Sequence, residues 1–132
     1  MREEGIDRIE VHVAGICIDG DKVLLAKRSS SRNLYPGLWE CGGGHVKHGE
    51  NFVEACKRQL REELGVVVEP VSVVSTYEIS PGKIPGVKFL CHLVSYAEPR
   101  ISEEHTEWRW QPLDKLDELE LIPGLKEDIL GL

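Results

Sequence analysis

One amphipathic helix, placed between two glycine turns, constrains this sequence more than any other feature. The stretch GGGHVKHGENFVEACKRQLREELGV predicts a helix over residues 50–64 that ends at Gly65. Its apolar residues recur with the spacing of one helical face: Val53, Cys56, Leu60 and Leu64. The three glycines before the helix leave room for short strands only. The chain must therefore bring a helix against a sheet built from its other segments.

The segments around this helix are β-branched and predict strands. Gly20 and Asp21 separate two apolar runs and predict a hairpin. The strands are expected over residues 10–19, 22–28, part of 38–46, 66–80 with a break or bulge at Pro70, 87–98 and 107–113. Two further helices are expected over 114–122 and 123–132, separated by Pro123 and Gly124. This order predicts an α+β or α/β sandwich of helices around a mixed sheet.

Length and charge limit the function classes. The chain has 132 residues, which predicts a single domain over 1–132 that is long enough to bury a core. Its formal net charge of -7 argues against binding a nucleic-acid polymer, which requires clustered Lys and Arg. If the ligand is itself an anion, a divalent cation is the expected means of overcoming the repulsion.

The cysteines and the N-terminus indicate a reducing compartment. Cys17, Cys41, Cys56 and Cys91 form no CxxC pair and are expected to be buried free thiols. Cys41, His45 and His48 lack a fourth ligand at a spacing typical of zinc. The N-terminal MREEGIDRIE has no apolar core, and no segment reaches the ~18 apolar residues of a membrane span. A cytoplasmic protein without a membrane partner is expected.

The predicted helix carries a polar cluster at its end. At about 100° per residue, Gln59, Glu62 and Glu63 share an arc of roughly 100° that borders the apolar face. Carboxylates on a rigid element suit Mg²⁺, which takes a few protein oxygens and keeps waters and phosphates as its other ligands. A solvated helix end would have the same composition, because Glu favours helices. Periodicity alone leaves both interpretations open.

The spacing of the surrounding residues resembles the signature of the Nudix (MutT-like) hydrolases. That signature reads G-x5-E-x7-R-E-U-x-E-E-x-G-U, where U is aliphatic. The matching positions here are Gly44, Glu50, Arg58, Gln59, Leu60, Glu62, Glu63, Gly65 and Val66, of which Gln59 alone departs from the pattern. The stretches LLAKR, YPGLW and EEH…WRWQPLDKL also resemble the family, so the likeness covers nearly the whole chain.

The resemblance implies a fold, an activity and a metal. Nudix proteins are α/β/α sandwiches with a catalytic loop–helix–loop. They hydrolyse nucleoside diphosphates linked to another group, with Mg²⁺ or Mn²⁺ as cofactor. By resemblance, Glu62 and Glu63 are metal ligands that also serve catalysis, and Gly44 lets the backbone approach the metal. Glu50 and Arg58 are expected to shape the loop and orient the glutamates.

Further site residues are expected outside the signature. The family often adds an acid from a loop before a late strand, and Glu104 is the preferred match over Glu103 and Glu107. For substrate binding, Arg28 is expected to hold a phosphate. Tyr35 and Trp39 are aromatic candidates for stacking on a base, as are Phe89 and Trp108. The substrate is expected to be a nucleoside triphosphate or a related small diphosphate compound, and a monomer and a homodimer are both open.

Gln59 opens two alternatives to this enzyme. Its amide cannot accept a proton as a carboxylate does, although its carbonyl oxygen can still bind a metal. The base would then be Glu104 or a neighbour, or the chain would be a nucleotide-binding Nudix domain that is weak or inactive as a hydrolase. Isopentenyl-diphosphate isomerases form the second alternative, because PGLW is followed here by Cys41 and His45. Against it, the strand VKFLCHLVSY lacks the paired acids of those enzymes.

Overall fold

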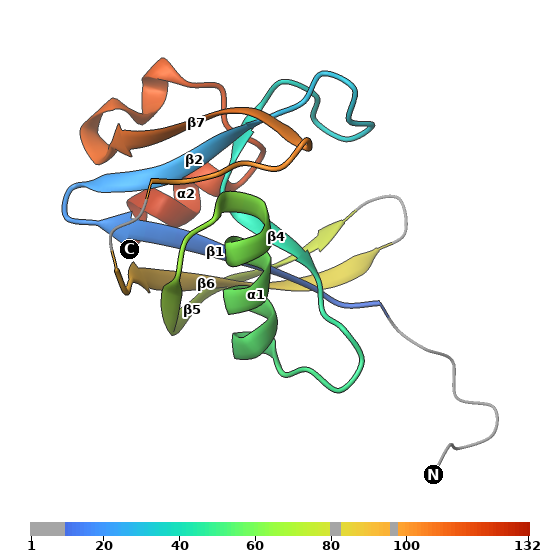
Figure 1. The fold of residues 1–132 in the computed structure, drawn as a ribbon. Coiled ribbons are helices and arrows are strands. Elements are labelled where there is room, and N and C mark those ends of the chain that lie inside the picture. The colour runs from blue at the N-terminus through green and yellow to red at the C-terminus, as the bar shows by residue number, and fades with distance from the viewer. Residues whose placement is uncertain (1–9, 80–82, 96–97) are drawn as a thin grey trace, which may run out of the picture.

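A mixed seven-stranded sheet forms the centre of the molecule (Figure 1). The computed structural model describes residues 10–79, 83–95 and 98–132. The strands are β1 (His12–Asp19), β2 (Lys22–Arg28), β3 (Trp39–Glu40), β4 (Gly42–His45), β5 (Val68–Ile79), β6 (Ile84–Leu93) and β7 (His105–Pro112). The helices are α1 (Phe52–Leu64), the 3₁₀ helix η1 (Leu113–Glu118) and α2 (Leu125–Leu130).

The sheet has the order β3-β2-β1-β6-β5, with β4 also paired to β1 and β7 to β2. The predicted hairpin is confirmed, since Asp19 pairs with Lys22 across a turn at Gly20, whose φ is 62°. The β1–β6 pair is parallel, and the other pairs are antiparallel. The pairing of β5 with β6 shifts register at Pro70, which confirms the bulge predicted there.

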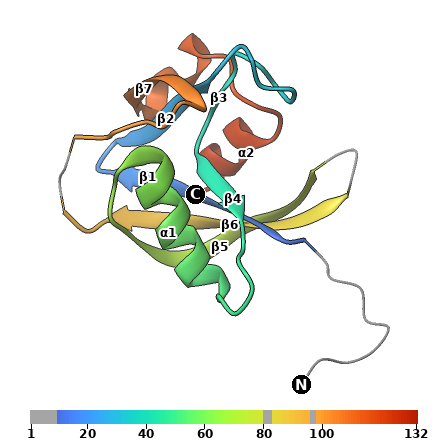
Figure 2. The ribbon, with the colours of Figure 1, turned by 45° about the vertical axis from the view of Figure 1, so that its right-hand side comes forward.

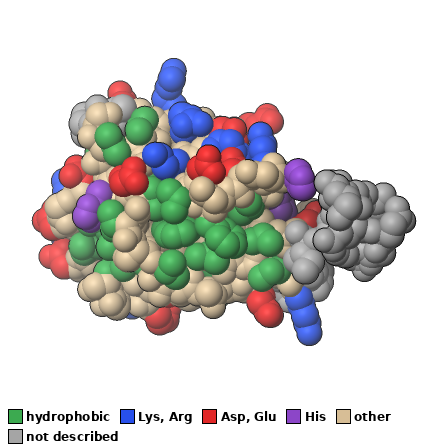
Figure 3. Space-filling model, turned by 90° about the horizontal axis from the view of Figure 1, so that it is seen from below, with side chains coloured by type: hydrophobic (Ala, Val, Ile, Leu, Met, Phe, Trp, Pro, Cys, Tyr) green, Lys and Arg blue, Asp and Glu red, His purple; other side chains and the backbone are tan. Residues whose placement is uncertain are grey.

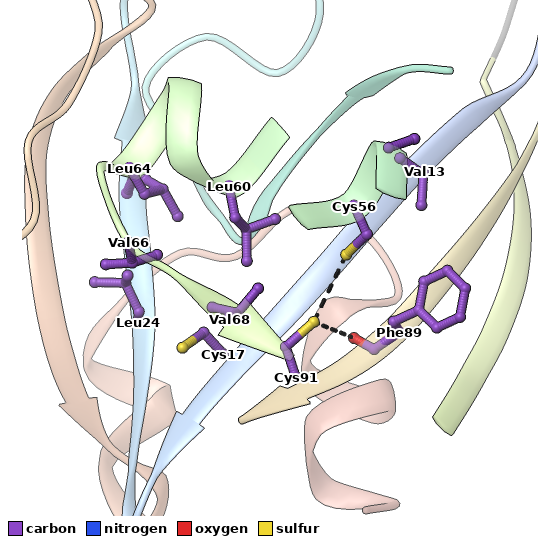
Figure 4. Packing of buried hydrophobic residues seen from close by; sticks show 12 residues of the cluster. Val13, Cys17, Leu24, Cys56, Leu60, Leu64, Val66, Val68, Phe89 and Cys91 are labelled. Carbon is purple, nitrogen blue, oxygen red and sulfur yellow. Dashed lines mark hydrogen bonds between the residues drawn. The ribbon is translucent and has the colours of Figure 1, made fainter. Parts of the chain in front are cut away.

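Helices cover both faces of this sheet (Figure 2). On one face, Cys56, Leu60 and Leu64 of α1 pack against β1, β5 and β6 in a core that includes Val13 and Cys91 (Figure 4). On the other face, α2 and η1 pack on a second core, to which β1 and β2 contribute the alternate residues. The predicted α/β sandwich is confirmed.

Helix α1 is held at both ends by its own sequence. Asn51 is the N-cap, and its side chain and that of Glu54 accept each other's backbone N–H in a capping box. Gly65 ends the helix with a φ of 69°. The prediction placed the start at residue 50 and Val53 on the buried face, and both were wrong. The buried face of α1 begins at Ala55, two residues after Val53, which is itself 39% exposed.

The predicted helix over 114–122 was also wrong beyond residue 118. Leu119 is extended, and Leu121 forms a parallel bridge with Trp39. The Trp39 N–H donates to the Glu120 carbonyl, and the Ile122 N–H donates to the Trp39 carbonyl. Because β3 offers its free edge here, backbone pairing across the chain outweighs local helix propensity.

Other element bounds differ by a few residues. Strand β6 begins at Ile84 and ends at Leu93, against a prediction of 87–98, and β7 begins at His105. Parts of the predictions fall on residues 1–9, 80–82 and 96–97, which lie outside the described residues. Within the described part of the chain, no helix is long and apolar enough to cross a membrane.

All four cysteines are buried and free, as the sequence predicted. The Sγ atoms of Cys56 and Cys91 lie 3.6 Å apart in the core below α1 (Figure 4). This separation is well beyond the ~2 Å of a disulfide bond. The pair therefore packs as small apolar side chains between the helix and the sheet.

The β5 edge of the sheet is apolar where it meets solvent. Seen from below, where β5 forms the edge, apolar side chains gather on the surface (Figure 3). Val71 and Val73 of β5 are 49% and 59% exposed. This surface lies away from the β2–β7 side of the sheet.

Candidate active site

Glu63 is a half-buried carboxyl group on the last turn of α1. Its Oε1 accepts the Gly43 N–H of strand β4 over 2.7 Å. Burial, followed by a hydrogen bond with Glu104, raises the pKa of Glu63 to about 9. Among the described residues, no Lys or Arg forms an ion pair with Glu63. Helix α1 and strand β4 thus hold an acidic side chain that has no Lys or Arg partner among the described residues.

Glu104 lies on the loop before β7 and faces Glu63. The Ser29 N–H donates to the Glu104 carbonyl over 2.9 Å, which ties this loop to the end of β2. The hydrogen bond from Glu63 lowers the pKa of Glu104, and the nearby Arg32 guanidinium acts in the same direction. The pair therefore shares one proton, with Glu63 holding it and Glu104 ionised. The loop acid predicted from sequence does reach the helix acid.

Arg58 connects the loop before α1 to the helix. Its Nε and Nη2 donate to the two carboxylate oxygens of Glu50 over 2.7 and 2.9 Å, and Nη2 also donates to the His45 carbonyl. Its Nη1 donates to Glu62 over 3.1 Å. The Arg58 hydrogen bonds hold the pKa of Glu50 down at about 2. Arg58 thus fixes the loop and orients Glu62, whose side chain is 53% exposed.

Gln59 packs directly on Gly44. A side-chain carbon on Gly44 would lie 2.4 Å from the amide group of Gln59, so any larger residue at this position would displace the Gln59 side chain. The Gln59 Nε2 donates to the His45 carbonyl over 3.0 Å. The amide therefore acts as a hydrogen-bond donor, and an ionised Glu at this position could not donate this hydrogen bond.

The three predicted substrate residues do not form an open binding face. Arg28 is 7% exposed and donates to both oxygens of Glu40 and to the Leu34 carbonyl. Trp39 is 5% exposed, in the core that α2 covers, with the Arg109 guanidinium over its ring. Tyr35 alone is exposed, on the loop between β2 and β3. Arg28 and Trp39 therefore offer no open face to a ligand in this structure.

Two residues that the sequence did not single out complete the site. Glu40 accepts from Arg28 and lies 2.8 Å from the His105 Nε2 atom, so it joins β2, β3 and β7. Arg32 lies 3.2 Å from the Glu104 carboxylate. Neither position has a local signal, because each partner comes from a distant part of the chain.

The donor set at this site fits a divalent cation. Glu63 and Glu104 crowd two carboxyl groups together, and the neighbouring Glu40 raises the pKa of Glu63 further. Carboxylate oxygens are ligands that Mg²⁺ and Mn²⁺ prefer. The described residues hold no ready group of three or more acidic, His or Cys side chains around one point. Such a cation would therefore share a small protein ligand set with water and substrate, as Mg²⁺ usually does.

Comparison with known proteins decides the family. The model of the NUDIX domain matches residues 8–129. The chain belongs to the NUDIX domain family. The resemblance to the Nudix family inferred from the signature is thereby confirmed. The matched range includes α1 and every strand of the sheet.

Individual relatives show how far the likeness extends. This NUDIX domain is 37% identical over 90 residues to m7GpppN-mRNA hydrolase NUDT17 of Xenopus laevis, covering 65% of this chain and 30% of that protein. It is 44% identical over 50 residues to nucleoside triphosphatase NudI of Enterobacter sp. (strain 638), covering 38% of this chain and 36% of that protein. The match spans about a third of the length of these curated relatives.

The fold agrees with a solved structure. The MutT protein from Methanosarcina mazei Go1 superposes with a TM-score of 0.76 at 22% identity, covering 92% of this chain and 90% of that one. At this identity the match supports the shared fold and says nothing about substrate.

Proposed function

We propose that this NUDIX domain hydrolyses a phosphoanhydride bond in a small nucleotide, with Mg²⁺ or Mn²⁺ as cofactor. The observation that carries the proposal is the pair of Glu63, which is half-buried, and Glu104, which faces it from the loop before β7. Within the described ranges Glu63 has no ion-pair partner, and its Oε1 accepts the Gly43 N–H. An acid at the end of a rigid helix and a second acid facing it from a loop favour binding of a divalent cation, and a bound cation favours binding of a polyphosphate.

Different residues of the chain have different roles in the proposed reaction. Glu62 and Glu63 would hold the cation, with the Gln59 carbonyl oxygen and the backbone at Gly44 beside them. Arg58 positions Glu62 through the hydrogen bonds described above. When bound, the cation neutralises phosphate charge and lowers the pKa of a bound water. Glu104, the ionised member of the pair, would accept the proton of the water that attacks phosphorus while the P–O bond of the anhydride breaks.

A nucleoside triphosphate or a nucleoside diphosphate derivative is the proposed substrate class. The relatives support it in their names, one as a nucleoside triphosphatase and the other as an mRNA cap hydrolase. One name describes a nucleoside triphosphate and the other the m7GpppN end of an mRNA, and both contain a chain of linked phosphates. The net charge of -7 favours a small ligand over a nucleic-acid polymer.

A panel of nucleoside triphosphates and nucleoside diphosphate sugars tests the proposal. Incubation with Mg²⁺ or Mn²⁺ is expected to release pyrophosphate or phosphate from at least one member, and Glu63→Gln is expected to stop the release. Absence of turnover on every member with either metal would reject hydrolysis of these compounds.

A binding domain without hydrolysis is the second candidate, and Gln59 is the observation that favours it. Its amide donates to the His45 carbonyl, so the side chain has a structural role that an ionised carboxylate could not take. If the chain is such a binding domain, calorimetry is expected to detect nucleotide binding while the substrate panel shows no turnover. The isomerase alternative is not proposed, because burial raises the pKa of the Cys41 thiol to about 12 and removes it from reach of a ligand.

A further inference from the structure

Arg32 reaches the carboxylate that serves as general base in the proposed function. Its Nη1 atom lies 3.2 Å from Oε2 of Glu104. The backbone brings the two side chains together, because the Ser29 N–H donates to the Glu104 carbonyl. Figure 1 shows the loop between β2 and β3, in cyan, running beside the start of β7.

The turn that carries Arg32 is held on both sides. The Arg32 N–H donates to the Ser29 carbonyl over 3.1 Å, and the Ser31 N–H donates to the Ser29 Oγ. Further along, the Arg28 Nε donates to the Leu34 carbonyl over 2.8 Å. The base of the Arg32 side chain is therefore fixed, while its long stem leaves the guanidinium room to change partners.

The contact between Arg32 and Glu104 leaves hydrogen-bonding capacity unused. The Nη1 atom of Arg32 is buried and makes no hydrogen bond of good geometry, although it lies within ion-pair distance of Glu104. The two side chains are 31% and 48% exposed. An ion pair this exposed biases the side chains toward contact by at most about fivefold. A better partner would displace it.

The other two arginines of the site are already satisfied. Arg28 donates to both oxygens of Glu40 and to a backbone carbonyl. Arg58 donates to both oxygens of Glu50, to Glu62 and to a backbone carbonyl. Arg32 differs from them in having unused donors next to the acids that the substrate's phosphates would approach.

We infer that Arg32 is a phosphate-binding residue that changes partner on binding, leaving Glu104 for a phosphate oxygen of the substrate. This inference rests on the proposed function. A phosphate carries more negative charge than a carboxylate and accepts the planar guanidinium fork through two oxygens. The exchange also separates the Glu104 carboxylate from the Arg32 guanidinium. Binding of the substrate and release of Glu104 to act as general base therefore occur in one step.

Calorimetric titration with inorganic tripolyphosphate and Mg²⁺ tests the inference without requiring turnover. Arg32→Gln is expected to bind about tenfold more weakly than wild type, as expected for the loss of a charge-assisted contact. Lys57→Gln is the matched control, since it removes the same charge from an exposed ion pair with Glu69 on the far side of α1. Its affinity is expected to stay within twofold of wild type.

Equal affinities for Arg32→Gln and Lys57→Gln, or no tripolyphosphate binding by wild type, would overturn the inference. Arg32→Lys is the second variant and decides the matter if Arg32→Gln does not fold. It keeps the charge but loses the fork, and about threefold weaker binding is expected. An affinity for Arg32→Lys equal to that of wild type would then count against a guanidinium contact.

Kinetics on the best substrate of the panel separates this inference from the proposed function. Arg32→Gln is expected to raise KM about tenfold while kcat stays within threefold, whereas a merely structural defect lowers kcat and thermal stability together. If no substrate is turned over but tripolyphosphate binding still depends on Arg32, hydrolysis is rejected and the inference stands. If turnover is seen and KM does not depend on Arg32, the inference fails alone.

Discussion

The carboxyl groups of Glu63, on the last turn of α1, and Glu104, on the loop before β7, face each other; burial and this contact raise the pKa of Glu63, and the same contact lowers the pKa of Glu104. Opposite pKa shifts of this kind leave one proton on the pair, and burial keeps it on Glu63. The Gly43 N–H supports the same carboxyl group from strand β4. Three segments far apart in the sequence thus build one acidic centre, and its properties can be tested directly.

Glu63→Gln is expected to stabilise the cation-free protein at alkaline pH. The pKa of Glu63 is about 9 in the folded protein against 4.5 ordinarily, so the folded state binds a proton that the unfolded chain has released. Stability from this group is complete below about pH 4.5 and is lost as the pH rises to about 9. Gln has the same shape but no charge at any pH, so this loss does not occur. The free energy of unfolding of the variant is expected to exceed that of wild type by about 1–3 kcal/mol at pH 8.5.

Urea unfolding in EDTA at pH 6 and pH 8.5 measures this gain. Glu69→Gln is the control, because it makes the same chemical change at an exposed ion pair away from the acidic centre. A pH dependence in Glu63→Gln as steep as that of wild type would contradict the shared proton.

Glu50→Gln is expected to loosen the loop before α1. The carboxylate of Glu50 accepts two hydrogen bonds from Arg58, which lower its pKa to about 2. Because the folded pKa is depressed, the stabilisation is present above about pH 4.5 and disappears as the pH falls toward 2. The variant is expected to lose about 1–3 kcal/mol at pH 7. Denaturant unfolding at pH 7 and pH 3 measures this, and the difference in free energy of unfolding between wild type and variant is expected to be smaller at pH 3.

Alanine at two neighbouring glycines is expected to have unequal effects. A side-chain carbon on Gly43 would lie 2.6 Å from the Val13 carbonyl oxygen, where backbone must move. On Gly44 it would meet only the end of the Gln59 side chain, which can swing away. We expect Gly43→Ala to cost about 3 kcal/mol or more and Gly44→Ala about 1 kcal/mol, as lost Gln59 contacts. Thermal unfolding of the two variants gives the order, and the reverse order would show that the contact at Gln59 is the stiffer one.

Gln59→Glu is expected to trade stability for metal affinity. The variant lacks the hydrogen bond that the Gln59 amide donates to the His45 carbonyl, and it adds a negative charge beside Glu62 and Glu63. Without metal, its free energy of unfolding is expected to be lower than that of wild type by about 1–2 kcal/mol. Mg²⁺ affinity is expected to tighten severalfold, since a carboxylate holds the ion better than an amide. Thermal unfolding in EDTA and calorimetry with Mg²⁺ measure the two effects. A variant that gains turnover absent from wild type would favour the binding-domain alternative.

The sequence by itself determined the elements whose signals are local. The helix that ends at Gly65 follows from apolar periodicity and a positive-φ glycine, and the turn at Gly20 follows from two flanking apolar runs. The spacing from Gly44 to Gly65 also identified the family. These features depend on residues within a few turns of one another, so the chain carries them without reference to the rest of the fold.

Tertiary structure decided which side chains are open and which are paired. Arg28 was predicted to face a phosphate, but Glu40 and the Leu34 carbonyl take up its guanidinium. Arg32, with no local signal, meets Glu104 because the β2–β3 loop is tied to the start of β7. An ion pair is set by the distance between strands that are remote in sequence, and residue spacing contains no measure of that distance. The chain's own pattern therefore predicted the helix that carries the acids, and the packing of the sheet chose their partners.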